Sequence, residues 1–278
     1  VKSTTGKQSP STPRTQRLRQ AFMAERPTIC AERNVSVTRS YQETEALPPV
    51  LRQAMAFART LDEMPIWIRD EELIVSNLAS KPGGSFLFPE YDDSLLIQEL
   101  DAISTRRVDP WQLEEDDKAL IRSCGEYWRG RNMKAMADAR AADESRSLFN
   151  SPMGKMTGVG HIAPDIEGVI KRGLNAFIAE AEAHIARLDL TKPEDFAKLP
   201  FLKAVIIADK AAVRWAGRFA ALAREKAAIE PNDDRKRELE EIAAVCERVP
   251  ASPARNFREA VQAAAFIMAS VQIEQPGV

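Results

Sequence analysis

Histidine is the side chain best suited to proton transfer near neutral pH, and the sequence contains only two, His161 and His184. His161 closes the stretch TGVGH at residues 157–161, where two glycines let the backbone approach a ligand closely while the imidazole projects into a cavity. His184 lies in a predicted helix beside Glu180 and Glu182, which indicates an exposed position. The alternative for His161 is a loop or core histidine without a chemical role.

The three cysteines, Cys30, Cys124 and Cys246, do not form a recognisable chemical site. They are far apart, odd in number and outside any Cys-x-x-Cys pattern, which argues against a disulfide framework and against a zinc site. Neither histidine has a second histidine or a cysteine at metal-ligand spacing. We therefore expect three reduced, structural cysteines and no bound metal.

Motifs of common enzyme classes are missing. The glycines within residues 154–160 do not follow the order G-x-G-x-x-G, and no G-x-x-x-x-G-K-[ST] or G-x-S-x-G sequence occurs. The acidic clusters at residues 114–117 and 238–241 fit helix starts or solvated helix faces. Trp215 and Phe219 lie four residues apart, which favours a buried helix face over a stacking platform. Ordinary hydrolases and nucleotide enzymes are thereby excluded.

The composition fits a soluble globular protein with a substantial core. The 278 residues include 44% hydrophobic and 29% charged side chains, and the formal net charge is -2. Such a balance provides no general attraction for nucleic acid or an anionic membrane. No apolar run approaches the roughly 18 residues of a membrane helix, and the N-terminus is polar. We expect a cytoplasmic location.

Periodicity predicts a mainly α fold with few strands. Residues 1–13 are small, polar and proline-containing, which is typical of a flexible arm, so the folded domain is expected over residues 14–278. The best strand candidates are Ile66, Ile68 and residues 73–75. Apolar residues at helical spacing predict helices over residues 14–26, 35–45, 48–64, 95–103, 114–128, 166–188, 201–228, 233–248 and 257–273.

The last predicted helix is apolar around most of its circumference. Its apolar residues include Val261, Ala264, Ala265, Met268 and Val271. A helix of this kind must be covered on several sides. We expect either that the earlier helices close over it or that a partner chain does.

Several long stretches resemble one enzyme family, in order along the chain. They are RLRQAFMAERPTICAERN at 17–34, MPIWIRDEELIVSNLASKPGGSFLFPEY at 64–91, YWRGR at 127–131, GVGHIAPDIEGVIKRGL at 158–174, RKRELEEIAAVCERVPASPARNFREAVQ at 235–262 and VQIE at 271–274. Together they resemble the N-terminal third of the glycyl radical enzymes of the pyruvate formate-lyase superfamily. The likeness is greatest to the branch of glycerol and diol dehydratases, choline trimethylamine-lyase and hydroxyproline dehydratase.

The resemblance implies the N-terminal helical part of an α/β barrel enzyme that eliminates water or an amine from a small polyol-like or amino-alcohol substrate. Such enzymes store a radical on a glycine in an Arg-Val-x-Gly-Tyr loop and pass it to a cysteine in a Gly-Cys-x-Glu loop. The thiyl abstracts hydrogen from the substrate, and the glutamate acts as a base. The resemblance also implies that His161 faces the substrate and that Phe149 and Thr157 line the same cavity.

Both radical loops are missing from this sequence. Cys246 stands in Val-Cys-Glu within a predicted helix, and neither Arg107-Val108 nor Arg248-Val249 is followed by the glycine. The chain alone is therefore expected to be inactive, to be incomplete at its C-terminal end, and to bind no cofactor itself. The alternative is a non-catalytic helical scaffold or gene remnant that binds a partner chain.

The resemblance implies several partners for the complete enzyme. These are the remaining C-terminal part, a small-molecule substrate, and an activating enzyme that installs the glycyl radical with S-adenosylmethionine and an iron-sulfur cluster. A homodimer is compatible with it, and so is a polar extension that directs some members into bacterial microcompartments. Nucleic acid and membrane are not expected partners.

Overall fold

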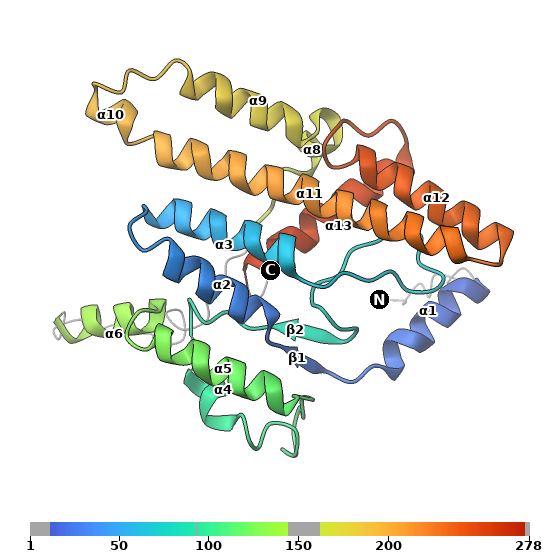
Figure 1. Cartoon of the computed structure of the whole chain (residues 1–278), viewed down its shortest axis with the longest axis horizontal. Coiled ribbons are helices and arrows are strands. Elements are labelled where there is room, and N and C mark those ends of the chain that lie inside the picture. The colour runs from blue at the N-terminus through green and yellow to red at the C-terminus, as the bar shows by residue number, and fades with distance from the viewer. Residues whose placement is uncertain (1–11, 93, 144–161, 276–278) are drawn as a thin grey trace, which may run out of the picture.

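The computed structural model describes residues 12–92, 94–143 and 162–275, and helices dominate these parts of the chain (Figure 1). The helices are α1 (Pro13–Ala24), α2 (Glu32–Glu43), α3 (Pro49–Glu63), α4 (Ser94–Glu99), α5 (Glu115–Trp128), α6 (Met133–Asp143), α8 (Ile166–Arg172), α9 (Leu174–Ile185), α10 (Pro193–Phe196), α11 (Leu199–Ile229), α12 (Asp233–Arg248) and α13 (Phe257–Glu274). The mainly helical fold expected from the sequence is confirmed. Most of the expected arm lies outside the described residues, and α1 begins at Pro13, with Thr12 as its N-cap.

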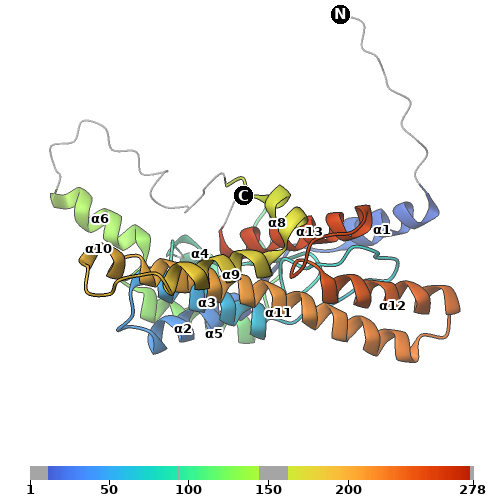
Figure 2. The same ribbon diagram turned by 90° about the horizontal axis from the view of Figure 1, so that it is seen from above.

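Helix α11 is the central element of the main layer. It runs for 31 residues and packs along its length against α3, α9 and α12, while α2 lies against α3 (Figure 1). Small side chains allow this close packing, because seven of the buried residues of α11 are alanines. Seen from above, α8 and α13 lie on one side of this layer (Figure 2).

Aromatic side chains join α11 to α13 in the core. The ring of Trp215 lies 5.4 Å from that of Phe219 and 5.5 Å from that of Phe266 on α13, measured between centroids. All three side chains are fully buried. The edge-on arrangements are the ones that aromatic pairs prefer. The predicted core role of Trp215 and Phe219 is confirmed.

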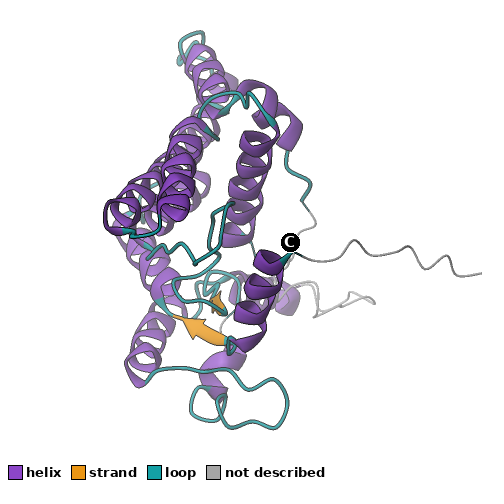
Figure 3. Ribbon diagram, turned by 90° about the vertical axis from the view of Figure 1, so that its right-hand side faces the viewer, coloured by secondary structure: helices purple, strands orange, loops and turns teal. Residues whose placement is uncertain are grey.

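The strands differ from the prediction. The stretch 66–75 is irregular, whereas β1 (Thr28–Cys30) and β2 (Gly84–Phe86) form the parallel pair. Figure 3 shows how small this sheet is beside the helices. Side chains replace ladder partners in the irregular stretch: the amide of Gln262 donates to Val75 O at 2.7 Å and accepts from Val75 N at 2.9 Å. Because buried backbone groups can be satisfied this way, apolar runs alone did not specify a strand.

The helix predicted over residues 166–188 is interrupted at Gly173. This glycine has a φ of 73°, a conformation that other residues rarely adopt. The break turns the chain so that Leu174 N donates to Pro250 O at 2.8 Å and Asn175 N donates to Ala251 O at 3.0 Å. The start of α9 is thereby attached to the loop after α12. Apolar spacing continues across the break and conceals it.

A buried arginine links three distant segments of the chain. Arg33 on α2 is 2% exposed and donates from Nε to Ile273 O at 2.8 Å and from Nη1 to Leu87 O at 2.9 Å. Its Nη2 donates to Glu90 at 2.5 Å, and its guanidinium lies 4.0 Å from the ring centroid of Phe88. Burial favours a lower pKa for Arg33, but Glu90, together with Glu274 and Tyr91, outweighs burial and the pKa is raised. The C-terminal end of α13 is held by this contact.

Replacing Gly173 by alanine is expected to destabilise the fold. The positive φ costs roughly 1–3 kcal/mol for a residue with a side chain. A Cβ would also lie 2.5 Å from Ala251 O, which forces further displacement. Gly217→Ala is the matched control, because a Cβ there meets nothing within 4 Å and a helical alanine gains about 0.5–1 kcal/mol. Denaturant unfolding should separate the two variants, and equal stabilities would contradict the role of Gly173.

Arg33→Met should destabilise the protein by roughly 3–5 kcal/mol, because it leaves Glu90 and two carbonyl groups without their donor. The control is Arg122→Met, which removes an exposed pair with Asp101 at 2.7 Å and should cost less than about 1 kcal/mol. The free energy of unfolding measures both changes. If Arg33→Met lowers the free energy of unfolding as little as Arg122→Met does, the contact made by Arg33 does not hold α13.

Candidate functional site

The residues predicted to line a substrate cavity, His161, Phe149 and Thr157, lie outside the described residues. Pro164, three residues after His161, is among the residues that line the apolar cavity described below. The other histidine, His184, is exposed on α9, as predicted.

The cysteines occupy structural positions. Cys30, Cys124 and Cys246 are all buried, and none of them forms a disulfide bond. Cys246 lies inside α12, where burial raises the pKa of its thiol to about 12. A thiol of this kind is neither ionised nor accessible at neutral pH. Within the described ranges, no group of three or more His, Cys, Asp or Glu residues is arranged to hold a metal ion.

An apolar cavity of about 530 Å³ opens between α3, α8, α9, α11 and α13, and we call it the α3–α13 cavity. Phe57 of α3, Phe177 of α9 and Ala212 of α11 supply parts of its wall. Helix α13 contributes Ile267 and Val271. These positions come together because Arg33 fixes the end of α13 and α11 supplies the opposing face.

A few polar groups interrupt this apolar wall. Ser270 and Glu274 lie four residues apart on α13 and therefore share one face of the helix. Ser270 is 8% exposed, and its hydroxyl has no hydrogen-bond partner within the described part of the chain. Gln53 of α3 donates to Glu274 Oε1 at 2.7 Å. Asp209 of α11 also lines the cavity.

Burial perturbs both carboxyl groups. It raises the pKa of Asp209 to about 6, and no other cause contributes. It also raises the pKa of Glu274 to about 7, against the opposing effects of Arg33 and Gln53 and with a contribution from Glu90 in the same direction. Carboxyl groups in this range can exchange a proton or pair with a cation near neutral pH.

One face of α13 is only partly covered. The earlier helices bury the stripe that contains Phe266 and Ile273. The stripe named from the sequence lies elsewhere on the helix and is half-buried: Val261, Ala264, Ala265, Met268 and Val271. Val271 also lines the α3–α13 cavity, so the cavity and this stripe are continuous. The expectation that the earlier helices close over α13 holds for one of its faces.

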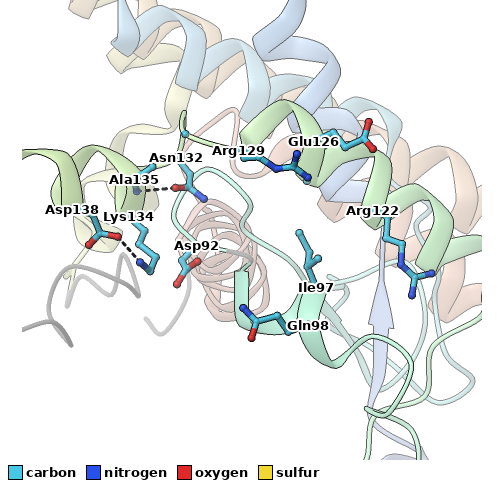
Figure 4. Close-up of a pocket in the computed structure, with 12 residues that line it drawn as sticks. Asp92, Ile97, Gln98, Arg122, Glu126, Arg129, Asn132, Lys134, Ala135 and Asp138 are labelled. Atoms are coloured by element: carbon cyan, nitrogen blue, oxygen red, sulfur yellow. Dashed lines mark hydrogen bonds and ion pairs between the residues drawn. The ribbon is translucent and has the colours of Figure 1, made fainter.

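Figure 4 shows a second cavity, of about 540 Å³, between α4, α5 and α6. Two of its cations have partners of their own: Lys134 pairs with Asp138, and Arg122 with Asp101. Asn132 accepts from Ala135 N at 2.9 Å and caps α6. Because none of its described residues carries an unpartnered buried polar atom, this cavity has no feature that indicates a ligand.

Sequence reasoning missed Asp209, Ser270 and Glu274. A signal existed for Asp209, which is a lone acid after the apolar run AVIIA at residues 204–208. Glu274 likewise ends the apolar run of the last helix. Their convergence depends on how α11 and α13 pack, which periodicity does not reveal. No helix in the described ranges combines the length and hydropathy needed to cross a membrane.

Comparison with known proteins identifies the family. The pyruvate formate lyase-like family matches residues 8–278. An isethionate sulfite-lyase from Oleidesulfovibrio alaskensis is 34% identical over 270 residues, which make up 92% of this chain and 32% of that protein.

Solved structures of related enzymes indicate the same family. The B12-independent glycerol dehydratase from Clostridium butyricum superposes with a TM-score of 0.92 and 34% identity, over 97% of this chain and 35% of that one. A glycyl radical enzyme from Archaeoglobus fulgidus gives a TM-score of 0.85 at 29% identity, over 92% of this chain and 34% of that one. The chain thus spans about a third of the length of these proteins. The resemblance found in the sequence is confirmed: this chain belongs to the pyruvate formate lyase-like family of glycyl radical enzymes.

Proposed function

We propose that this chain is the N-terminal portion of a glycyl radical lyase that eliminates water or an amine from a small polyol-like or amino-alcohol substrate. The observation that carries the proposal is the similarity to glycerol dehydratase over nearly the whole chain, in sequence and in structure. The half-covered stripe of α13 supports it, because a longer enzyme has further chain to place there.

The chain alone is proposed to be inactive. A radical-carrying cysteine must reach its substrate, and the three cysteines here are buried structural residues. The sequence contains no Gly-Cys pair and no Arg-Val-x-Gly-Tyr loop. Both radical carriers would therefore come from the remaining part of the enzyme. A separate activating enzyme with S-adenosylmethionine and an iron-sulfur cluster would install the glycyl radical.

This chain's proposed contribution to catalysis is part of the substrate cavity wall. His161 would face the substrate hydroxyl, where an imidazole can exchange a proton. Phe149 and Thr157 would line the same cavity. We further propose a cytoplasmic enzyme.

A non-catalytic scaffold is the competing function. It is favoured by the same half-covered stripe of α13, because a partner chain of any kind could cover it. The reading frame after Val278 separates the two functions. The lyase requires that the Gly-Cys-x-Glu and Arg-Val-x-Gly-Tyr loops follow in that frame or on a second chain that copurifies. A stop codon without such a chain would leave the scaffold.

His161→Gln is expected to lower kcat/KM of the complete, activated enzyme by at least about 100-fold, the usual effect of removing a positioned proton-transfer group. The control is His184→Gln, since His184 is exposed on α9 and should not affect the rate. The glycyl radical signal in electron paramagnetic resonance should be equal in both variants. An unchanged rate for the His161 variant would contradict its role.

Asp209 should make the isolated chain less stable as pH rises, which is the reverse of the usual effect of a carboxyl group. Its folded-state pKa of about 6 exceeds the ordinary 3.8, so the folded state binds this proton more tightly than the unfolded state. The stabilisation is present below about pH 4 and is lost as pH rises through 6. Asp209→Asn removes this dependence, so the variant should gain about 1–3 kcal/mol relative to wild type between pH 4 and 7.

Asp101→Asn provides the control for this pH profile. Its hydrogen bond to Arg122 lowers the pKa of Asp101, so its contribution is lost as pH falls rather than as pH rises. Denaturant unfolding at several pH values measures both differences. A difference between the Asp209 variant and wild type that stays constant from pH 4 to 7 would refute the prediction.

A further inference from the structure

Asp209 is a carboxylate without a partner in an apolar wall. It makes no hydrogen bond or ion pair with any described residue, and its cavity neighbours on α11 include Val205, Ala208 and Ala212. The nearby cations of α11 are already engaged. Lys210 donates to Glu182 at 3.0 Å, and Arg214 pairs with Asp62 at 2.7 Å. Asp209 is half-buried, so its ionised form is less well hydrated than it would be on an open surface and is stabilised by a cation that joins it.

Ser270 on α13 gives an independent indication in the same cavity. Its hydroxyl is more than nine-tenths buried and lines the cavity, yet it has no partner among the described residues. Buried hydroxyl groups are nearly always hydrogen-bonded. A serine within a helix often bonds to the carbonyl four residues earlier, but no such bond is present here. No described residue satisfies this hydroxyl, and the cavity has room for a group that would.

We propose that the α3–α13 cavity binds an amphipathic cation, in which a guanidinium or ammonium head pairs with Asp209 while its apolar stem packs against Phe57 and Phe177. Ser270 and Glu274 are the further acceptors for the head. An anion would be repelled by the two carboxylates, and a neutral apolar group would leave Asp209 and Ser270 unpaired.

The cation is an arginine or lysine side chain from the remaining part of the enzyme, and this assignment rests on the proposed function. Such side chains combine an apolar stem with a charged head, as the cavity requires. The cavity also continues through Val271 into the half-covered stripe of α13, where that remaining part would pack. Arginine fits better than lysine, because its five donors can serve several acceptors at once.

The test measures binding between the 278-residue chain and the remaining part of the enzyme, supplied as a second polypeptide, by isothermal titration calorimetry. Asp209→Asn should weaken binding at least tenfold and Ser270→Ala by a smaller factor. Asp101→Asn, an exposed carboxylate paired with Arg122, should bind within twofold of wild type. Equal affinities for wild type and the Asp209 variant would overturn the inference. No binding by the wild-type chain would instead refute the proposed function.

Two further measurements test the ion pair in other ways, in case the Asp209 variant folds poorly. Carbon-13 NMR of the wild-type Asp209 carboxyl should show its pKa falling when the second polypeptide binds, and an unchanged pKa would contradict the ion pair. Butylguanidinium and its neutral analogue butylurea test whether a free small molecule, instead of a protein side chain, supplies the cation. If butylguanidinium binds the isolated chain below millimolar concentration while Asp209→Asn leaves polypeptide binding unchanged, the assignment to a side chain is wrong.

Discussion

The buried guanidinium of Arg33 is the contact on which the rest of this structure depends. It joins α2 and the segment around Glu90 to the last carbonyl groups of α13, which are about 240 positions away in sequence. Because the guanidinium is desolvated, its partners must be in place for the fold to be stable. The contact holds the C-terminal end of α13, the helix from which Ser270 and Glu274 line the cavity.

Helix α13 contributes residues both to the core and to the α3–α13 cavity. Its aromatic contact with Trp215 anchors one face in the main layer, whereas the stripe around Met268 stays half-buried. In the same cavity, Asp209 and Ser270 have no partners within the part of the chain that the structure describes. Incomplete packing and unpaired polar groups thus occur together at one place, as they would where a further part of an enzyme is attached.

Local patterns predicted the long helices well, because burial of an apolar stripe at helical spacing is what stabilises them. The strand predicted over Ile66, Ile68 and residues 73–75 does not form. Part of its backbone is satisfied from far along the chain, since the side chain of Gln262 bonds to Val75. Gly173 was overlooked because spacing continues across it. The family was predicted from long stretches of residues. The convergence of Asp209 and Ser270 on one cavity was not, because it arises only from tertiary packing.

Hydrogen exchange along α13 can show whether these helices stay incomplete until further chain covers that helix. Amide exchange is compared in the isolated 278-residue chain and in its complex with the remaining part of the enzyme. The account predicts that amides of residues 261–274 exchange faster in the isolated chain than those of α11 and become strongly protected in the complex. Equal, maximal protection of α13 and α11 in the isolated chain, unchanged by the second polypeptide, would contradict it.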